Sequence, residues 1–103
     1  MYDKKIKIEV QHFEGCPNSS EMIARVKAAI IEYDNQIGYK EILVETQDEA
    51  ERVKFRGSPT VLINGIDLEN MPEPKAGNLA CRYYKNGLPT VEQIKAFISN
   101  QLM

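Results

Sequence analysis

Two cysteines are the residues of this chain best suited to chemistry, and the first begins the segment Cys16-Pro17-Asn18-Ser19. A proline directly after a cysteine suits the first turn of a helix, where its missing N–H costs nothing. We therefore expect Cys16 at the N-cap of a helix, with its sulfur facing unpaired N–H groups and the positive end of the helix dipole. This environment favours thiolate over thiol and would make Cys16 a nucleophile. The alternative is an inert, buried cysteine at a helix start.

The composition restricts the classes of protein to which the chain can belong. Its 103 residues, 43% hydrophobic and 27% charged, suit one globular domain over residues 1–103. A formal net charge of −2, with Lys and Glu interspersed, argues against nucleic-acid binding and a polybasic membrane patch. No apolar run approaches the ~20 residues of a membrane span, and residues 1–5 contain no apolar signal segment. We therefore expect a cytoplasmic protein, in which distant cysteines are more often redox-active, metal-binding or buried than a structural disulfide.

Hydrophobic spacing predicts the elements on either side of Cys16. Apolar and polar residues alternate over residues 5–13, which predicts a half-buried strand with Gln11 on its polar face. Apolar residues then recur every three or four positions over residues 22–33. This spacing predicts an amphipathic helix that ends near Asp34-Asn35. The cysteine therefore lies at a strand-to-helix junction.

The rest of the chain is expected to form a strand, a short helix, a hairpin, a long loop and a closing helix. Thr46 and Thr90 each precede a Glu or Gln by three residues, which is the capping-box pattern of a helix start. Asn64-Gly65 suits a type I′ turn and therefore predicts the hairpin. The predicted ranges are, in order, 41–46, 46–55, 60–69, 70–89 and 90–102.

The predicted order is strand, helix, strand, helix, strand, strand, helix. The first two strands are joined by a helix and should be parallel, whereas the last two should form an antiparallel pair. The fold class is therefore α/β, with a four-stranded mixed sheet flanked by helices.

This order, with Cys-Pro-x-x after the first strand and Gly57-Ser58-Pro59-Thr60 before the third, resembles the thioredoxin-like superfamily in its glutaredoxin-sized form. The resemblance extends from Lys5 to Leu102. More narrowly, four segments are similar to small thioredoxin-like proteins related to domains found beside alkylmercury lyases. These segments are Gly15-Cys16-Pro17, Gly57-Ser58-Pro59-Thr60, Asn64-Gly65 and Cys81-Arg82-x-Tyr84.

The resemblance implies that the Ser58–Pro59 bond is cis, that Pro59 packs beside Cys16, and that the backbone before Pro59 is free to pair with an extended substrate. The chain departs from the Cys-x-x-Cys motif usual in this superfamily, because Ser19 occupies the last position. A Cys-x-x-Ser site can form a mixed disulfide but cannot resolve it within the motif. Ser19 either hydrogen-bonds the Cys16 sulfur or is an ordinary polar residue of the first helical turn.

Cys81 is the candidate for the missing second thiol. The predicted hairpin returns the chain toward the end of the sheet at which Cys16 should lie, so the topology permits a contact. Cys81 either comes within disulfide reach of Cys16, which requires Cα atoms roughly 4.4–6.8 Å apart, or anchors Tyr83 and Tyr84 to the core.

Three other residues could take part in the chemistry. For His12, a hydrogen-bonded strand histidine is favoured over a proton shuttle for the thiol. Arg56 and Arg82 could hold an anionic substrate such as glutathione, although single surface arginines are usually only solvated. One histidine and two cysteines do not make a structural zinc site, which normally has four ligands, but two thiolates suit a soft metal ion.

The sequence therefore predicts a small thiol-disulfide oxidoreductase with Cys16 as nucleophile and Cys81 as resolving thiol. The supporting residues are Pro17, Ser19, Ser58 and Pro59. The substrate would be a thiol or disulfide of a protein or a glutathione-like molecule. No cofactor is expected, since electrons would arrive from a separate thiol donor. Two alternatives remain: a module that captures a soft metal or organomercurial with its two thiols, and a redox-silent scaffold that binds protein partners.

Overall fold

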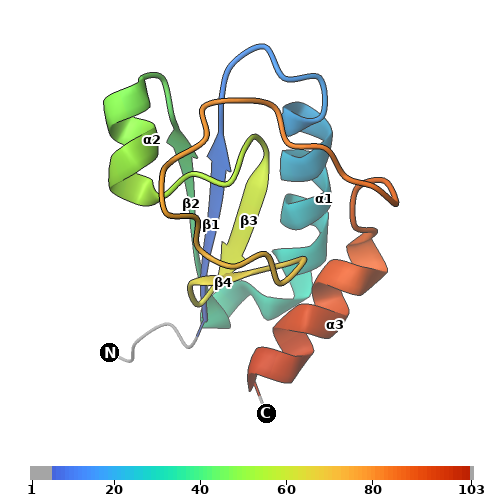
Figure 1. The fold of residues 1–103 in the computed structure, drawn as a ribbon. Coiled ribbons are helices and arrows are strands. Elements are labelled where there is room, and N and C mark those ends of the chain that lie inside the picture. Colours follow the sequence, from blue (N-terminus) through green and yellow to red (C-terminus); the bar gives the residue numbers. More distant parts are fainter. Residues whose placement is uncertain (1–5, 103) are drawn as a thin grey trace.

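The computed structural model describes residues 6–102, and residues 1–5 and 103 lie outside the described part (Figure 1). The predicted order of elements is confirmed, with a 3₁₀ helix, η1, added after the first helix. The predicted start of the first strand at Lys5 lies outside the described residues. The elements are β1 (Ile6–His12), α1 (Ser19–Ile30), η1 (Ile31–Gln36), β2 (Ile37–Leu43), α2 (Gln47–Val53), β3 (Thr60–Ile63), β4 (Ile66–Asp67) and α3 (Val91–Leu102).

Within residues 6–102 the strands form one mixed sheet in the order β2-β1-β3-β4. Strands β1 and β2 are parallel, with Ile6 opposite Ile37, and β3 is antiparallel to both β1 and β4. Asn64 and Gly65 have φ values of 54° and 81°, the two positive angles that a type I′ turn requires. The α/β class and the four-stranded mixed sheet flanked by helices are therefore confirmed.

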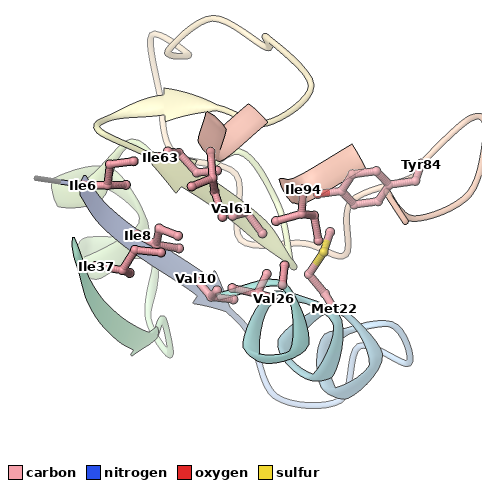
Figure 2. Close-up of a cluster of buried hydrophobic side chains, with 12 residues drawn as sticks. Ile6, Ile8, Val10, Met22, Val26, Ile37, Val61, Ile63, Tyr84 and Ile94 are labelled. Carbon is pink, nitrogen blue, oxygen red and sulfur yellow. The ribbon is translucent and has the colours of Figure 1, made fainter. Parts of the chain in front are cut away.

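The main hydrophobic core lies between the sheet and helices α1 and α3 (Figure 2). The apolar face predicted for β1 is confirmed, because alternate residues of this strand are fully buried. The side chains with 1% exposure or less include Ile6, Ile8, Val10, Met22, Val26, Val61, Ile63, Ile94 and Ile98. A smaller cluster around α2 contains Val44, Ala50 and Phe55.

The polar face predicted for β1 is wrong at Gln11, which is only 1% exposed. Its cross-strand partner on β3 is Thr60, which is fully buried. The guanidinium of Arg82 donates a hydrogen bond to the Thr60 hydroxyl, so the loop that follows β4 covers this end of the sheet. Alternation along a strand predicts which side chains share a face, but not whether a distant loop covers that face.

Several predicted boundaries differ from the structure. Helix α1 ends at Ile30 rather than near Asp34-Asn35, because the chain continues as the 3₁₀ helix η1. Strand β2 covers Ile37–Leu43 rather than residues 41–46, because it pairs with β1 from Ile6 onward. Helix α2 ends at Val53, two residues early, since Lys54 adopts the left-handed conformation with a φ of 53°. The capping boxes predicted at Thr46 and Thr90 are both present. No helix of the described part is long and apolar enough to cross a membrane.

The loop from residue 70 to residue 89 packs tightly against α2 and the segment after it. Asn78 N–H donates to the carbonyl of Phe55, with 2.8 Å between N and O. The amide of Gln47 donates to the Gly77 carbonyl, with 3.2 Å between N and O. A Cβ atom placed on Gly77 would collide with the backbone of Ala50 and Glu51. Glycine at this position therefore permits the close approach of loop and helix.

Replacing Gly77 by Ala is expected to destabilise the protein by about 1–3 kcal/mol, because the backbone of α2 cannot move away without losing its hydrogen bonds. Urea unfolding of the wild type and of Gly77→Ala measures this difference. The neighbouring, exposed Ala76 provides the control, since Ala76→Ser should leave the midpoint nearly unchanged. Equal midpoints for Gly77→Ala and the wild type would contradict the close approach.

Candidate thiol-disulfide site

The two cysteines are joined to each other by a disulfide bond. Their Cα atoms are 5.6 Å apart, although 65 positions separate them in the sequence. Cys16 lies in the turn between β1 and α1 and is 7% exposed, whereas Cys81 lies in the loop after β4 and is exposed. Of the two alternatives considered for Cys81, the position within disulfide reach of Cys16 is therefore the one that the structure contains.

The expected N-cap position of Cys16 is wrong. Helix α1 begins at Ser19, with Asn18 as the N-cap residue. Cys16 instead belongs to a tight turn in which its N–H donates to the Phe13 carbonyl and its own carbonyl accepts from the Ser19 N–H. Pro17 therefore precedes the helix rather than occupying its first turn. Cys16 still lies near the N-terminal end of α1, two residues before the cap.

The Ser19 hydroxyl pairs with the Ser58 hydroxyl, with 3.0 Å between the oxygens, rather than with the Cys16 sulfur. The Ser58 hydroxyl also accepts a hydrogen bond from the Phe13 N–H, with 2.8 Å between N and O. Ser19 is 9% and Ser58 1% exposed. This buried network connects the end of β1, the start of α1 and the loop that contains Pro59.

The Ser58–Pro59 peptide bond is cis, as the resemblance implies. The backbone before Pro59, however, is not free. Ser58 N–H donates to the carbonyl of Ala80, and Arg82 N–H donates to the carbonyl of Ser58, each with 2.8 Å between N and O. Ser58 and Cys81 thus form a parallel bridge. The expectation of an open edge is wrong because the chain's own residues 80–82 occupy it.

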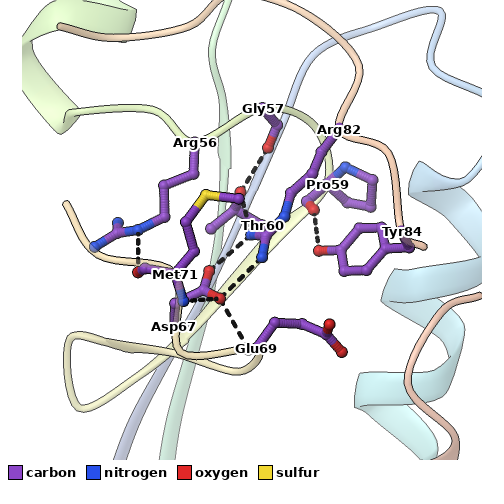
Figure 3. Close-up of polar contacts among 9 residues, drawn as sticks. All are labelled: Arg56, Gly57, Pro59, Thr60, Asp67, Glu69, Met71, Arg82 and Tyr84. Atoms are coloured by element: carbon purple, nitrogen blue, oxygen red, sulfur yellow. Dashed lines mark hydrogen bonds and ion pairs between the residues drawn. The ribbon is translucent and has the colours of Figure 1, made fainter. Parts of the chain in front are cut away.

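Arg82 does not present a free cation to a substrate. Its guanidinium makes two parallel hydrogen bonds to the Asp67 carboxylate, from Nη1 to Oδ1 at 2.7 Å and from Nη2 to Oδ2 at 2.9 Å (Figure 3). The exposed fractions of the two side chains are 5% and 1%. Arg56 is also buried, and its Nε donates to the Met71 carbonyl at 3.1 Å. The anion-binding role considered for these arginines is therefore wrong for Arg82, whose charge is already paired.

Tyr84 connects the same loop to Pro59. Its hydroxyl donates to the Pro59 carbonyl, and the guanidinium carbon of Arg82 lies 4.8 Å from the centre of its ring (Figure 3). Burial raises the pKa of the Tyr84 phenol above its usual range, although the positive charge of Arg82 opposes the shift. The phenol therefore remains a neutral hydrogen-bond donor at neutral pH. Tyr83, in contrast, is 84% exposed.

The remaining candidates contribute less to the site. His12 is the last residue of β1 and is half-buried, and its carbonyl accepts from Val44 N–H. Over residues 6–102, no group of three or more His, Cys, Asp and Glu side chains is arranged to hold a metal ion. A soft ion at the two thiols would therefore have no further such ligand from this part of the chain.

Asp67 is the residue of this region that sequence reasoning missed. It lies in β4 and is 2% exposed, although aspartate is rarely buried unless it is paired. The signal was present in the predicted hairpin, where a single carboxylate stands between two apolar residues, Ile66 and Leu68. Its partner Arg82 lies 15 residues away, in a loop without periodicity.

Comparisons with known proteins give a structural match but no sequence match. No family model and no curated protein matches the chain. A structure of human ERp44 in its zinc-bound form superimposes with a TM-score of 0.62 and 17% sequence identity. The match covers 97% of this chain and 27% of that one, so the chain spans about a quarter of the protein it resembles. At this identity the likeness concerns the fold alone.

The stability of the protein is expected to fall in acid through Asp67. Burial by itself raises the pKa of its carboxyl, but hydrogen bonds from Arg82, Met71 and Glu69 and the Arg82 charge outweigh it and lower the pKa. A carboxyl with a lowered pKa stabilises the fold above its ordinary value of 3.8. This contribution is lost as the pH falls through the folded-state pKa.

Urea unfolding from about pH 6 to about pH 2 measures this effect. At about pH 6 the free energy of unfolding should be larger for the wild type than for Asp67→Asn, and this difference should become smaller toward about pH 2. Glu73→Gln, at an exposed loop position, is the control, and its free energy of unfolding should change with pH as that of the wild type does. A constant difference between Asp67→Asn and the wild type across this range would contradict the assignment.

Proposed function

We propose, from the premise that the chain has a thioredoxin-like fold, that the protein is a small thiol-disulfide oxidoreductase. The observation that carries the proposal is the disulfide between Cys16 and Cys81, which joins the strand-to-helix turn to the loop after β4. In the proposed cycle the protein alternates between this disulfide and two free thiols. The second thiol that the Cys-x-x-Ser segment lacks is thus supplied from outside the motif.

The proposed reaction consists of two thiol-disulfide exchanges. The thiolate of Cys16 attacks one sulfur of a substrate disulfide, which forms a mixed disulfide and releases the other substrate sulfur as a thiolate. The thiolate of Cys81 then attacks the Cys16 sulfur, which forms the Cys16–Cys81 bond and releases the second substrate thiolate. Two electrons pass from the protein to the substrate, and a separate dithiol donor returns them by the reverse exchanges.

Two features of the site support these roles. Cys16 lies two residues before the N-cap of α1, where the positive end of the helix dipole favours a thiolate over a thiol. Cys81 is an exposed residue, so a donor thiol can approach it from solvent. Pro17, Ser19, Ser58 and Pro59 are proposed to support the site by holding the turn and the loop together. The buried hydroxyl pair of Ser19 and Ser58 is the contact behind this role.

Turnover is tested by reduction of insulin disulfides with a dithiol donor. Cys16→Ser is expected to lose activity to the background rate, because the attacking sulfur is missing. Cys81→Ser should still form a mixed disulfide with glutathione, detected by mass spectrometry, but turn over at least about tenfold more slowly because nothing resolves it. Ser20→Ala, at an exposed position of α1, is the control and should retain full activity.

The same variants separate the alternatives. Equal activity of Cys16→Ser and the wild type would contradict the proposal and favour a redox-silent scaffold. Stoichiometric binding of a soft metal ion by the reduced protein, lost equally in Cys16→Ser and Cys81→Ser without any turnover, would favour metal capture.

A further inference from the structure

The segment that carries Cys81, residues 80–84, is irregular except for the bridge at Cys81, and the exposure of its side chains alternates over residues 81–84. Cys81 and Tyr83 are exposed, whereas Arg82 and Tyr84 are each 8% exposed. The carbonyl of Ala80 and the N–H of Arg82 are bonded to the backbone of Ser58 on the two sides of Cys81. The segment is therefore docked on the loop that contains Pro59 by contacts that involve neither sulfur.

The side chain of Arg82 adds a buried charged anchor to this docking. Its partner carboxylate, on Asp67, is itself held rigidly, because Oδ2 also accepts from the N–H groups of Glu69 at 2.8 Å and Met71 at 3.1 Å. Two-point hydrogen bonds between a guanidinium and a carboxylate are strong and fix the relative orientation of the two groups. Undocking the segment would leave the Asp67 carboxylate without its cation at a buried position, which is unfavourable.

We propose that Asp67 and Arg82 are positioning residues that keep Cys81 beside Cys16 after the disulfide is reduced. The reason is that none of the contacts described above involves either sulfur, so opening the S–S bond removes none of them. In the reduced protein the thiol of Cys81 therefore has a high effective concentration at Cys16. The proposal depends on the proposed function only in giving Cys81 the role of resolving thiol.

The step that this positioning accelerates is the second exchange of the cycle. With a substrate bound to Cys16 as a mixed disulfide, the thiolate of Cys81 attacks the Cys16 sulfur. The Cys16–Cys81 bond forms, the bond from Cys16 to the substrate breaks, and the substrate leaves as a thiolate. If the segment were undocked after reduction, this attack would be slower, because a flexible loop would first have to bring the Cys81 thiol back to Cys16 at a cost in entropy.

The test is the equilibrium of the Cys16–Cys81 disulfide with reduced and oxidised glutathione, which requires no substrate and no turnover. Asp67→Asn is expected to lower the equilibrium constant for disulfide formation about tenfold. In this variant the disulfide still holds the segment in the oxidised form, but the segment undocks in the reduced form. Arg82→Lys keeps the charge but loses the two-point contact, so a smaller drop is expected. Glu21→Gln, in the exposed pair of Glu21 with Arg25, is the matched control and should leave the constant unchanged.

A second measurement on the reduced wild type needs no variant that could fail to fold. Hydrogen exchange, followed by NMR, should show that the N–H groups of Arg82 and Ser58 remain protected after reduction. Loss of this protection would overturn the proposal, as would a folded Asp67→Asn with an unchanged equilibrium constant. The glutathione equilibrium and the hydrogen exchange could both give the expected results while the protein fails to reduce insulin. In that case the positioning role of Asp67 and Arg82 is supported and the proposed oxidoreductase function is contradicted.

Discussion

The backbone pairing at Ser58 is the interaction on which the site depends. Residues 80–82 bond to the N–H and the carbonyl of this one residue, and Cys81 lies between the two bonds. Buried backbone groups that lack a partner are costly, so Ser58, at 1% exposure, requires such a neighbour. Residues 80–82 of the loop after β4 provide these partners, and this pairing places the Cys81 sulfur next to the Cys16 sulfur.

The ion pair beneath the loop explains how a stretch without regular structure can be held in one position. Removing two charges from water is unfavourable unless geometry and further hydrogen bonds compensate for it. Here the carboxylate of Asp67 has donors from Arg82, Glu69 and Met71, and the guanidinium also reaches Thr60. The pair thus contributes mainly to the placement of the loop over the sheet, and less to net stability.

The same contacts divide the two cysteines into different environments. Cys16 is enclosed by the turn and by the docked segment, at 7% exposure, whereas Cys81 faces solvent beside the exposed ring of Tyr83. Residues 80–82 occupy the edge next to Pro59, so an extended substrate does not pair there while this segment is docked.

Local patterns in the sequence were sufficient for the elements and the fold class. The alternation of β1, the capping boxes at Thr46 and Thr90, and the Asn64-Gly65 turn depend on neighbours within a few residues, and all are present. The start of α1, the burial of Gln11 and the Asp67–Arg82 pair depend instead on contacts with the loop over residues 70–89 or on the turn at Cys16. That loop has no periodicity from which its path could be predicted. Tertiary packing alone therefore decided that Cys16 is paired with Cys81 and that the edge at Ser58 is closed.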